Sequence, residues 1–100
     1  MTEMSSSRLN SNFNTYYLEV SLEDGVWCDA IKIPEGDINH IVYVVSTEDD
    51  AMSSHVQVSL SADDTDAIWI DFVTGEINPA VNLFRARVDG GAGTLQIRCQ

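Results

Sequence analysis

The chain has 100 residues, of which 44% are apolar and 21% are charged, and its formal net charge at pH 7 is −11. This length predicts one globular domain, and the acidity disfavours binding to nucleic acid or to anionic membranes, because both require Lys and Arg. No apolar run approaches the roughly 20 residues of a membrane helix, and the first ten residues lack a signal peptide's apolar region.

The N-terminal residues 1–13 are rich in Ser and Asn and show little periodicity. We expect them to form a mobile arm, and residues 14–100 to form the folded domain. The pattern changes at residue 14, where apolar and polar residues begin to alternate up to Leu22, which predicts a strand. A shorter strand over 26–33 follows, and Pro34 ends it because proline lacks the N–H that a central strand needs.

Two further strands follow in the middle of the chain. Residues 38–46 contain the run Ile-Val-Tyr-Val-Val, which is apolar on both faces. Such a strand is either buried on both sides or turns its second face toward another subunit. Residues 55–62 alternate cleanly, and we expect Val56, Val58 and Leu60 to point inward.

The next predicted strand places an aromatic residue on its outer face. If Ile68, Ile70 and Phe72 point inward, Trp69 points outward. An outward Trp can stack on a sugar or contact a protein, and it can equally be covered by loops of the same chain. Residues 73–82 form a connection to the final strands.

The last residues, 84–99, predict a β-hairpin. Two alternating arms flank the glycine-rich segment 89–93, which can take positive φ without strain. The inward set contains the apolar residues Phe84, Ala86, Val88, Leu95, Ile97 and Cys99. In total about seven strands with turns at short intervals predict an all-β fold, an antiparallel β-sandwich or jelly-roll-like domain.

Three of the five basic residues of the chain lie on the outward face of this predicted hairpin: Arg85, Arg87 and Arg98. Like charges on one face repel each other unless carboxylates neutralise them. The arginines either pair with acids of this chain, such as Glu19 or Asp71, or dock on an acidic surface of a neighbouring subunit.

The sequence gives little support for catalysis or for a cofactor. His40 and His55 have no accompanying nucleophile motif, and we predict a protein that is not an enzyme and requires no cofactor. Cys28 and Cys99 are expected to be buried free thiols, with a disulfide as the alternative. We predict no metal site, and the weak candidates for calcium are the acidic loop residues Asp49, Asp50, Asp63, Asp64 and Asp66.

Three segments together resemble a known group of proteins. They are Asp-Ala-Ile-Lys-Ile-Pro-Glu-Gly at 29–36, Trp-Ile-Asp-Phe-Val-Thr-Gly from Trp69, and the closing Phe-Arg-Ala-Arg-Val segment with its Gly-Gly-Ala-Gly-Thr-Leu-Gln-Ile-Arg continuation. Over residues 15–100 the chain resembles the small β-sandwich virion accessory proteins of tailed bacteriophages. The resemblance implies a head-decoration (cement) subunit or a tail-associated module without catalytic residues, made in the host cytoplasm and located in the virion.

Two functions from different classes follow. The first is a structural assembly protein that docks on other virion proteins and self-associates as a homo-oligomer, with no nucleic acid or membrane partner. Its partner surface would combine Arg85, Arg87 and Arg98, which set orientation, with apolar contact by Trp69 and Tyr43. The alternative is a ligand-binding module, for carbohydrate or dependent on calcium, that uses Trp27, Trp69 and the acidic loops.

Overall fold

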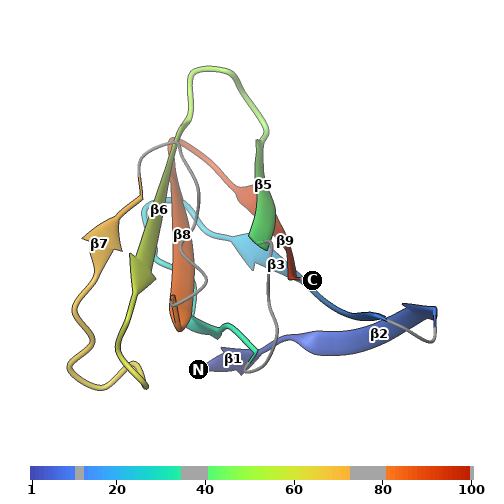
Figure 1. Ribbon diagram of the computed structural model, residues 1–100. Helices are drawn as coiled ribbons and strands as arrows, with labels where there is room; N and C mark the ends of the chain where they lie inside the picture. The colour runs from blue at the N-terminus through green and yellow to red at the C-terminus, as the bar shows by residue number, and fades with distance from the viewer. Residues whose placement is uncertain (11–12, 35–40, 73–80, 100) are drawn as a thin grey trace.

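The computed structural model describes residues 1–10, 13–34, 41–72 and 81–99. These residues contain nine strands in two sheets that pack face to face (Figure 1). The sandwich-like all-β fold predicted from the sequence is confirmed, with nine strands in place of about seven. The strands are β1 Thr2–Glu3, β2 Ser5–Asn10, β3 Phe13–Leu22, β4 Ile31–Lys32, β5 Ile41–Thr47, β6 Ser53–Ser59, β7 Ile70–Asp71, β8 Leu83–Asp89 and β9 Gly93–Cys99.

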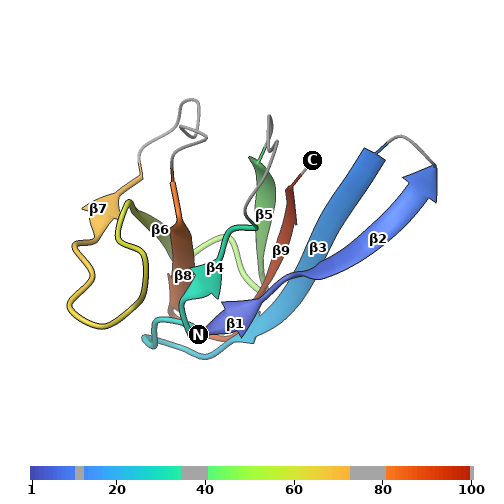
Figure 2. The same ribbon diagram turned by 60° about the horizontal axis from the view of Figure 1, so that its bottom comes forward.

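The strands are divided unevenly between the sheets. The β8 sheet has five strands in the order β1-β4-β8-β6-β7, and the β9 sheet has four in the order β2-β3-β9-β5. The described pairings are antiparallel except that of β1 with β4, which is parallel. Figure 2 shows β7, β6 and β8 on one side of the molecule and β5, β9, β3 and β2 on the other.

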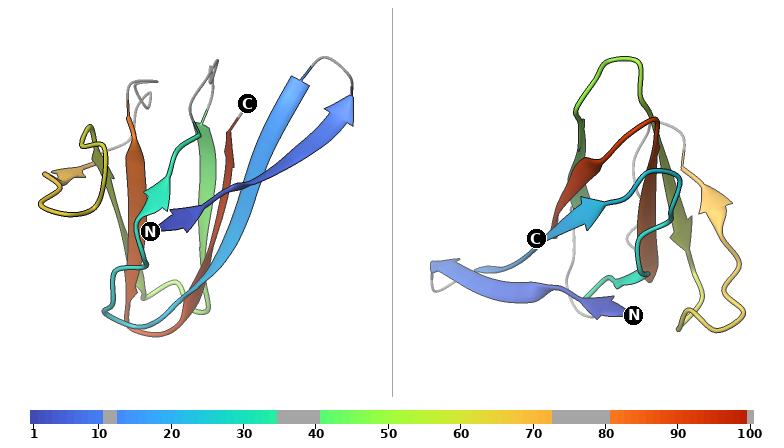
Figure 3. Two further views of the ribbon diagram at one scale, coloured as in Figure 1. Left: turned by 90° about the horizontal axis from the view of Figure 1, so that it is seen from below. Right: turned by 180° about the vertical axis from the view of Figure 1, so that it is seen from behind.

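The last two strands do not form the predicted hairpin. β8 pairs with β4 and β6, whereas β9 pairs with β3 and β5. The glycine-rich connection is therefore a corner that carries the chain from the β8 sheet into the β9 sheet (Figure 3). The sequence places both arms correctly along the chain, and its prediction that they pair with each other is wrong.

The reason lies in how the two apolar faces are buried. If the two arms were paired in one sheet, they would form one apolar face, and another layer would have to pack on that face to bury it. In separate sheets, the apolar faces of β8 and β9 both line the space between the layers, so each sheet supplies cover for the other. The predicted inward set is confirmed, because each of its members is at most 1% exposed: Phe84, Ala86, Val88, Leu95, Ile97 and Cys99.

Short contacts fix the corner between β8 and β9. Gly90 has a φ of 104°, which favours glycine, and its N–H donates to Asp24 Oδ1 at 2.8 Å. A Cβ on Gly93 would lie 2.7 Å from the carbonyl oxygen of Ser46. The start of β9 therefore has room only for glycine beside the end of β5.

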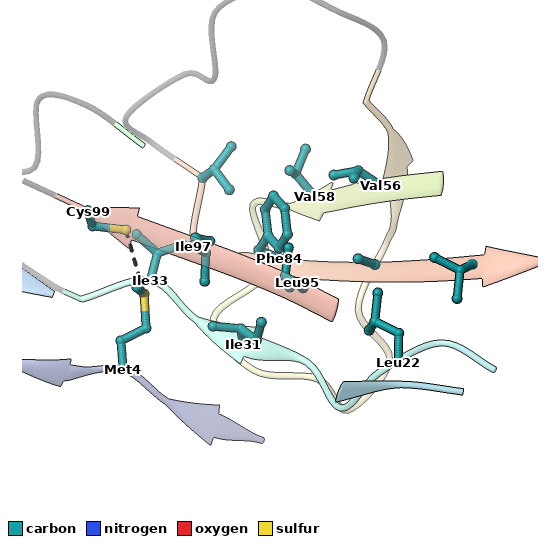
Figure 4. Close-up of a cluster of buried hydrophobic side chains, with 13 residues drawn as sticks. Met4, Leu22, Ile31, Ile33, Val56, Val58, Phe84, Leu95, Ile97 and Cys99 are labelled. Atoms are coloured by element: carbon teal, nitrogen blue, oxygen red, sulfur yellow. Dashed lines mark hydrogen bonds between the residues drawn. The ribbon is translucent and has the colours of Figure 1, made fainter. Parts of the chain in front are cut away.

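The core lies between the sheets and consists mainly of aliphatic side chains. Ile31, Phe84 and Leu95 are fully buried within it (Figure 4). The Cys99 thiol lies 3.6 Å from the sulfur of Met4. Burial raises the pKa of the Cys99 thiol to about 11, so the thiol stays protonated at neutral pH and packs as a small apolar group.

The N-terminal residues predicted to form a mobile arm lie in strands. β1 pairs with β4, and β2 pairs with β3. Between β1 and β2, Met4 is 9% exposed and belongs to the core cluster. The Met1 amino group lies 3.1 Å from the Asp29 carboxylate. These contacts describe the folded chain, and the mobility of this segment in the free monomer stays a prediction.

Two expectations about the second and fourth predicted strands are wrong. Of residues 26–33, only β4 is a strand, because the preceding residues cross from the β9 sheet to the β8 sheet. They touch β8 through single bonds, such as Cys28 N–H to the Ala86 carbonyl at 3.0 Å. Leu60 lies beyond the end of β6 and is 57% exposed, whereas Val56 and Val58 are buried as predicted.

The predicted inward set of the strand around Trp69 is also wrong in part. β7 has only two residues, and Ile68 and Ile70 are 76% and 51% exposed. Ile70 pairs with the buried Val58, so its side chain does lie on the inner face of the β8 sheet. Among the described strands, none of the β9 sheet extends past β5 to cover it.

Some predicted features lie outside the described residues. They are His40, the turn residues that follow Pro34, and most of the connection over 73–82. Within the described ranges, the structure has no helix of the length and apolar character needed to cross a membrane.

Replacement of Leu95 by Ala tests the core. Leu95 is fully buried, so the substitution should lower the free energy of unfolding by about 2–5 kcal/mol, measured by urea denaturation. The adjacent Gln96 is exposed, and Gln96→Ala should change the same quantity by no more than about 0.5 kcal/mol. Equal effects of the two substitutions would show that β9 does not alternate as described.

Candidate functional site

The outer face of the β8 sheet carries a row of polar side chains. Alternation along β8 sends Arg85 and Arg87 to this face. The strand register places Gln57 of β6 opposite Arg85 and His55 opposite Arg87. On the other side of β6, Asp71 of β7 lies opposite Gln57. The row therefore spans three neighbouring strands.

Arg85 contacts two tryptophans at the centre of this row. Its Cζ atom lies 4.5 Å from the ring centroid of Trp27 and 4.1 Å from that of Trp69. Its Nε donates to Gln57 Oε1 at 2.9 Å, and its Nη2 donates to the same oxygen. Desolvation lowers the pKa of Arg85, although a guanidinium stays charged in proteins. Arg85 is therefore held by cation–π and hydrogen-bond contacts within the chain.

A second group of contacts surrounds Arg87. Its Cζ lies 4.8 Å from the Trp27 ring centroid, and its Nη2 lies 3.2 Å from Asp89 Oδ2. The same carboxylate oxygen lies 2.9 Å from His55 Nε2. The Nε of Arg87 is buried and has no hydrogen-bond partner among the described residues. Asp89 therefore contacts both Arg87 and His55 on this face.

The three arginines do not share one face, contrary to the sequence-based expectation. Arg98 lies on β9, between Tyr17 of β3 and Val42 of β5, and is exposed on the outer face of the other sheet. The expectation is wrong because β8 and β9 belong to different sheets. Arg85 and Arg87 are thus on one side of the molecule, and Arg98 is on the other.

The carboxylates suggested as arginine partners have other hydrogen-bond donors. Glu19 accepts from the Tyr17 hydroxyl at 3.0 Å and from Gln96 Nε2 at 3.1 Å. Asp71 accepts from Gln57 Nε2 at 2.7 Å. Hydrogen bonding to Glu19 raises the pKa of Tyr17. On the outer face of each sheet, the carboxylate is therefore hydrogen-bonded to neighbouring side chains of the same chain.

The two aromatic residues proposed for partner contact have different surroundings. Trp69 lies on the outer face against Arg85 and is half-buried. Tyr43 points between the sheets, where its ring centroid lies 5.2 Å from that of Phe84 and 5.8 Å from that of Phe72. Burial raises the pKa of Tyr43. The partner role of both residues stays a prediction.

A groove of 660 Å³ opens where β7 stops covering the edge of β6. Its inner part lies between the sheets and is mainly apolar. Its outer part reaches the polar row around Arg87. Volumes of this size are common for ligand sites in proteins. The residues of the inner part are Tyr43, Val45, Ser54, Val56 and Phe72, and those of the outer part are Trp27, His55, Gln57, Asp71 and Arg87.

The free edge of the β9 sheet lies beside the inner part of this groove. β5 pairs with β9 on one side, and no other described strand pairs with it. Its seven residues contain neither a charge nor a proline. On the outer face Val42 and Val44 are 57% and 53% exposed. Of the two alternatives for this strand, burial on both faces is thus excluded in the monomer.

The weak metal candidates are not brought together into a metal site. In the part of the chain that the structure describes, no three His, Cys, Asp or Glu side chains are placed to hold an ion. The loops instead form local bonds, such as Ala51 N–H to Asp49 and Thr65 N–H to Asp63. Cys28 and Cys99 are free thiols.

The contacts that shape this region could not be predicted from the sequence. Gln57 belongs to a predicted strand and Asp89 to the predicted turn. Their contacts with Arg85, Arg87 and His55 depend on the register between β6 and β8, which are far apart in sequence. The open edge has a signal that could have been used, because β5 lacks the Lys or Pro that usually protects an edge strand.

Comparison with known proteins gives no family for this chain. No protein-family model, no curated protein and no solved structure matches it.

Replacement of Arg85 by Lys tests the contacts of the polar row. Lysine keeps the charge but loses the planar guanidinium that stacks on the indoles and donates twice to Gln57. We expect the free energy of unfolding to fall by about 1–3 kcal/mol, and the tryptophan emission to shift. Arg98→Lys, at an exposed position, should change neither quantity; equal effects of the two substitutions would contradict the described role of Arg85.

Proposed function

We propose that this chain is a non-enzymatic structural protein of a phage particle, which docks on capsid or tail subunits and acts in the virion. The proposal assigns no reaction and no cofactor to the chain. It takes up the resemblance of residues 15–100 to small virion accessory proteins and adds a docking surface.

The observation that carries the proposal is the open edge of β5. An exposed edge strand is a template for pairing with another chain, and natural proteins protect such edges with charges, prolines or very short strands. The edges of the β8 sheet, β1 and β7, have two residues each. β5 has seven residues and none of these protections, which favours a function in which a partner covers it.

The charge distribution agrees with docking through this edge. Arg85 and Arg87 are engaged with tryptophans, Gln57 and Asp89 of the same chain. They are therefore poorly placed to serve as the basic docking strip expected from the sequence. Docking then depends on backbone pairing and apolar contact at β5, with Arg98 at its outer face.

A second candidate is a saccharide-binding module. The groove of 660 Å³ favours it, because Trp27 lies beside polar side chains such as His55 and Asp71. Aromatic faces and planar polar groups are the usual means of binding sugars. However, Trp27 stacks on Arg85 and Arg87, which leaves less of its surface for a ligand.

The docking proposal predicts association with purified particles of the phage whose genome encodes this chain. Labelled protein should sediment with the particles in an ultracentrifuge. Substitution of both Val42 and Val44 by Lys should lower the bound fraction at least tenfold, because charge on an edge strand opposes strand pairing. Val26 is 51% exposed outside β5, and Val26→Lys should leave binding unchanged. Failure of the unmodified protein to sediment with particles would contradict the proposal.

A further inference from the structure

We propose that an extended segment of a partner chain pairs with β5 at the edge of the β9 sheet, where no described strand pairs. The segment is apolar at every second residue and basic at the end that lies beside the residues after β5. This inference rests on the proposed docking function and identifies the chemistry of the partner.

The first argument is the stacking of the two sheets. β8 and β9 are joined by the corner at residues 90–92, and β5 and β6 by residues 48–52, so each connection links strands of opposite layers. Tyr43 and Val45 of β5 line the same groove as Val56 of β6. The strand orders thus run in the same direction, with β5 above β6 and no described strand above β7.

The second argument is the exposure of the inner face at β7. Ile70 lies on the same face as the buried Val58, yet it is 51% exposed, and Ile68 is 76% exposed. An isoleucine on the core side of a sheet is exposed where the opposite layer does not reach it. A strand added to β5 would extend the β9 sheet over Ile70 and would fill the inner part of the groove beside Phe72.

A second copy of this chain does not fit the position. If its β5 paired with this β5, its own β6 would lie beneath that strand. That place in the β8 sheet is already filled by β7. The occupant is therefore a single extended strand without a second layer, such as an arm of another subunit, and a homo-oligomer would have to use a different surface.

The charge beside the end of β5 specifies one end of the partner segment. The residues that follow β5 include Glu48, Asp49 and Asp50. This acidic connection lies at one end of the molecule (Figure 1). Because complementary charge sets the orientation of a partner, we infer Lys or Arg at the end of the partner strand that lies beside this connection. The strand itself has about seven residues and is roughly 24 Å long.

The test uses the nine-residue peptide Lys-Val-Thr-Val-Thr-Val-Thr-Val-Lys, titrated into isotope-labelled protein and followed by NMR. Shifts should concentrate on β5 and on the residues around β7. A peptide of the same composition in the order Lys-Val-Val-Thr-Thr-Val-Val-Thr-Lys should bind at least tenfold more weakly. A peptide with Glu at both ends should also bind more weakly, with the difference shrinking at high salt.

Matched variants separate this position from the rest of the surface. Ile70 and Val26 are both 51% exposed; Ile70→Lys should weaken peptide binding at least tenfold, and Val26→Lys should not change it. Shifts on other strands, unchanged binding by Ile70→Lys, or a dimer formed through β5 would each overturn the inference. The mapping on the unmodified protein decides the question even if a variant folds poorly.

The outcomes also separate this inference from the proposed function. If the peptide binds at β5 and β7 but the protein does not sediment with particles, strand pairing at β5 stands and the virion function fails. If the protein sediments with particles and Ile70→Lys does so equally well, the virion function stands and strand pairing at β5 fails.

Discussion

The chain turns at residues 90–92 from the β8 sheet into the β9 sheet, and this turn directs the apolar faces of the last two strands into the same core. Phe84 on one side and Leu95 on the other are fully buried because of it. The turn is held by the left-handed backbone at Gly90 and its bond to Asp24. If the two strands were paired in one sheet, their apolar faces would point to the same side, and other parts of the chain would have to cover both of them.

The same turn decides where the charged residues lie. Arginines that alternate with core residues must point outward from whichever sheet holds their strand. Arg85 and Arg87 therefore meet tryptophans on the outer face of the β8 sheet, while Arg98 lies on the opposite side of the molecule. A basic strip that looks continuous along the sequence is thus divided by the fold.

The fold class and the inward residues of most strands could be predicted, because period-two alternation is local information. Pairing could not, since the alternation of Ala86 and Ile97 is the same in a hairpin and across a corner. The exposure of Ile70 could not be predicted either. It depends on how many strands the opposite sheet has, and the sequence around Ile70 carries no information about that number.

The candidate site was predictable only in fragments. Trp69 was correctly expected on an outer face, but its stacking on Arg85 depends on two strands that are separated in sequence. Tyr43 was expected to contact a partner; its side chain points between the sheets, and its role in partner contact stays a prediction. The sequence signal that could have indicated the open edge is the absence of charge and proline in β5, because natural edge strands are usually protected by such residues.

Among the described residues, the β9 sheet has one strand fewer than the β8 sheet. This difference accounts for both the open edge at β5 and the exposure of Ile70. With β5 as the last strand of its sheet, one side of its backbone bonds to β9 and the other side has no described partner. The N–H groups of an antiparallel strand alternate between its two sides. An open edge should therefore be visible residue by residue in the free protein.

Amide hydrogen exchange along β5, measured by NMR on the free protein, tests this account most directly. Alternate amides from Ile41 to Thr47 should exchange slowly where they bond to β9, and the amides between them should exchange rapidly because they face an uncovered edge. Slow exchange at every amide of the strand would mean that its second side is already paired, and would contradict the account of an open edge at β5.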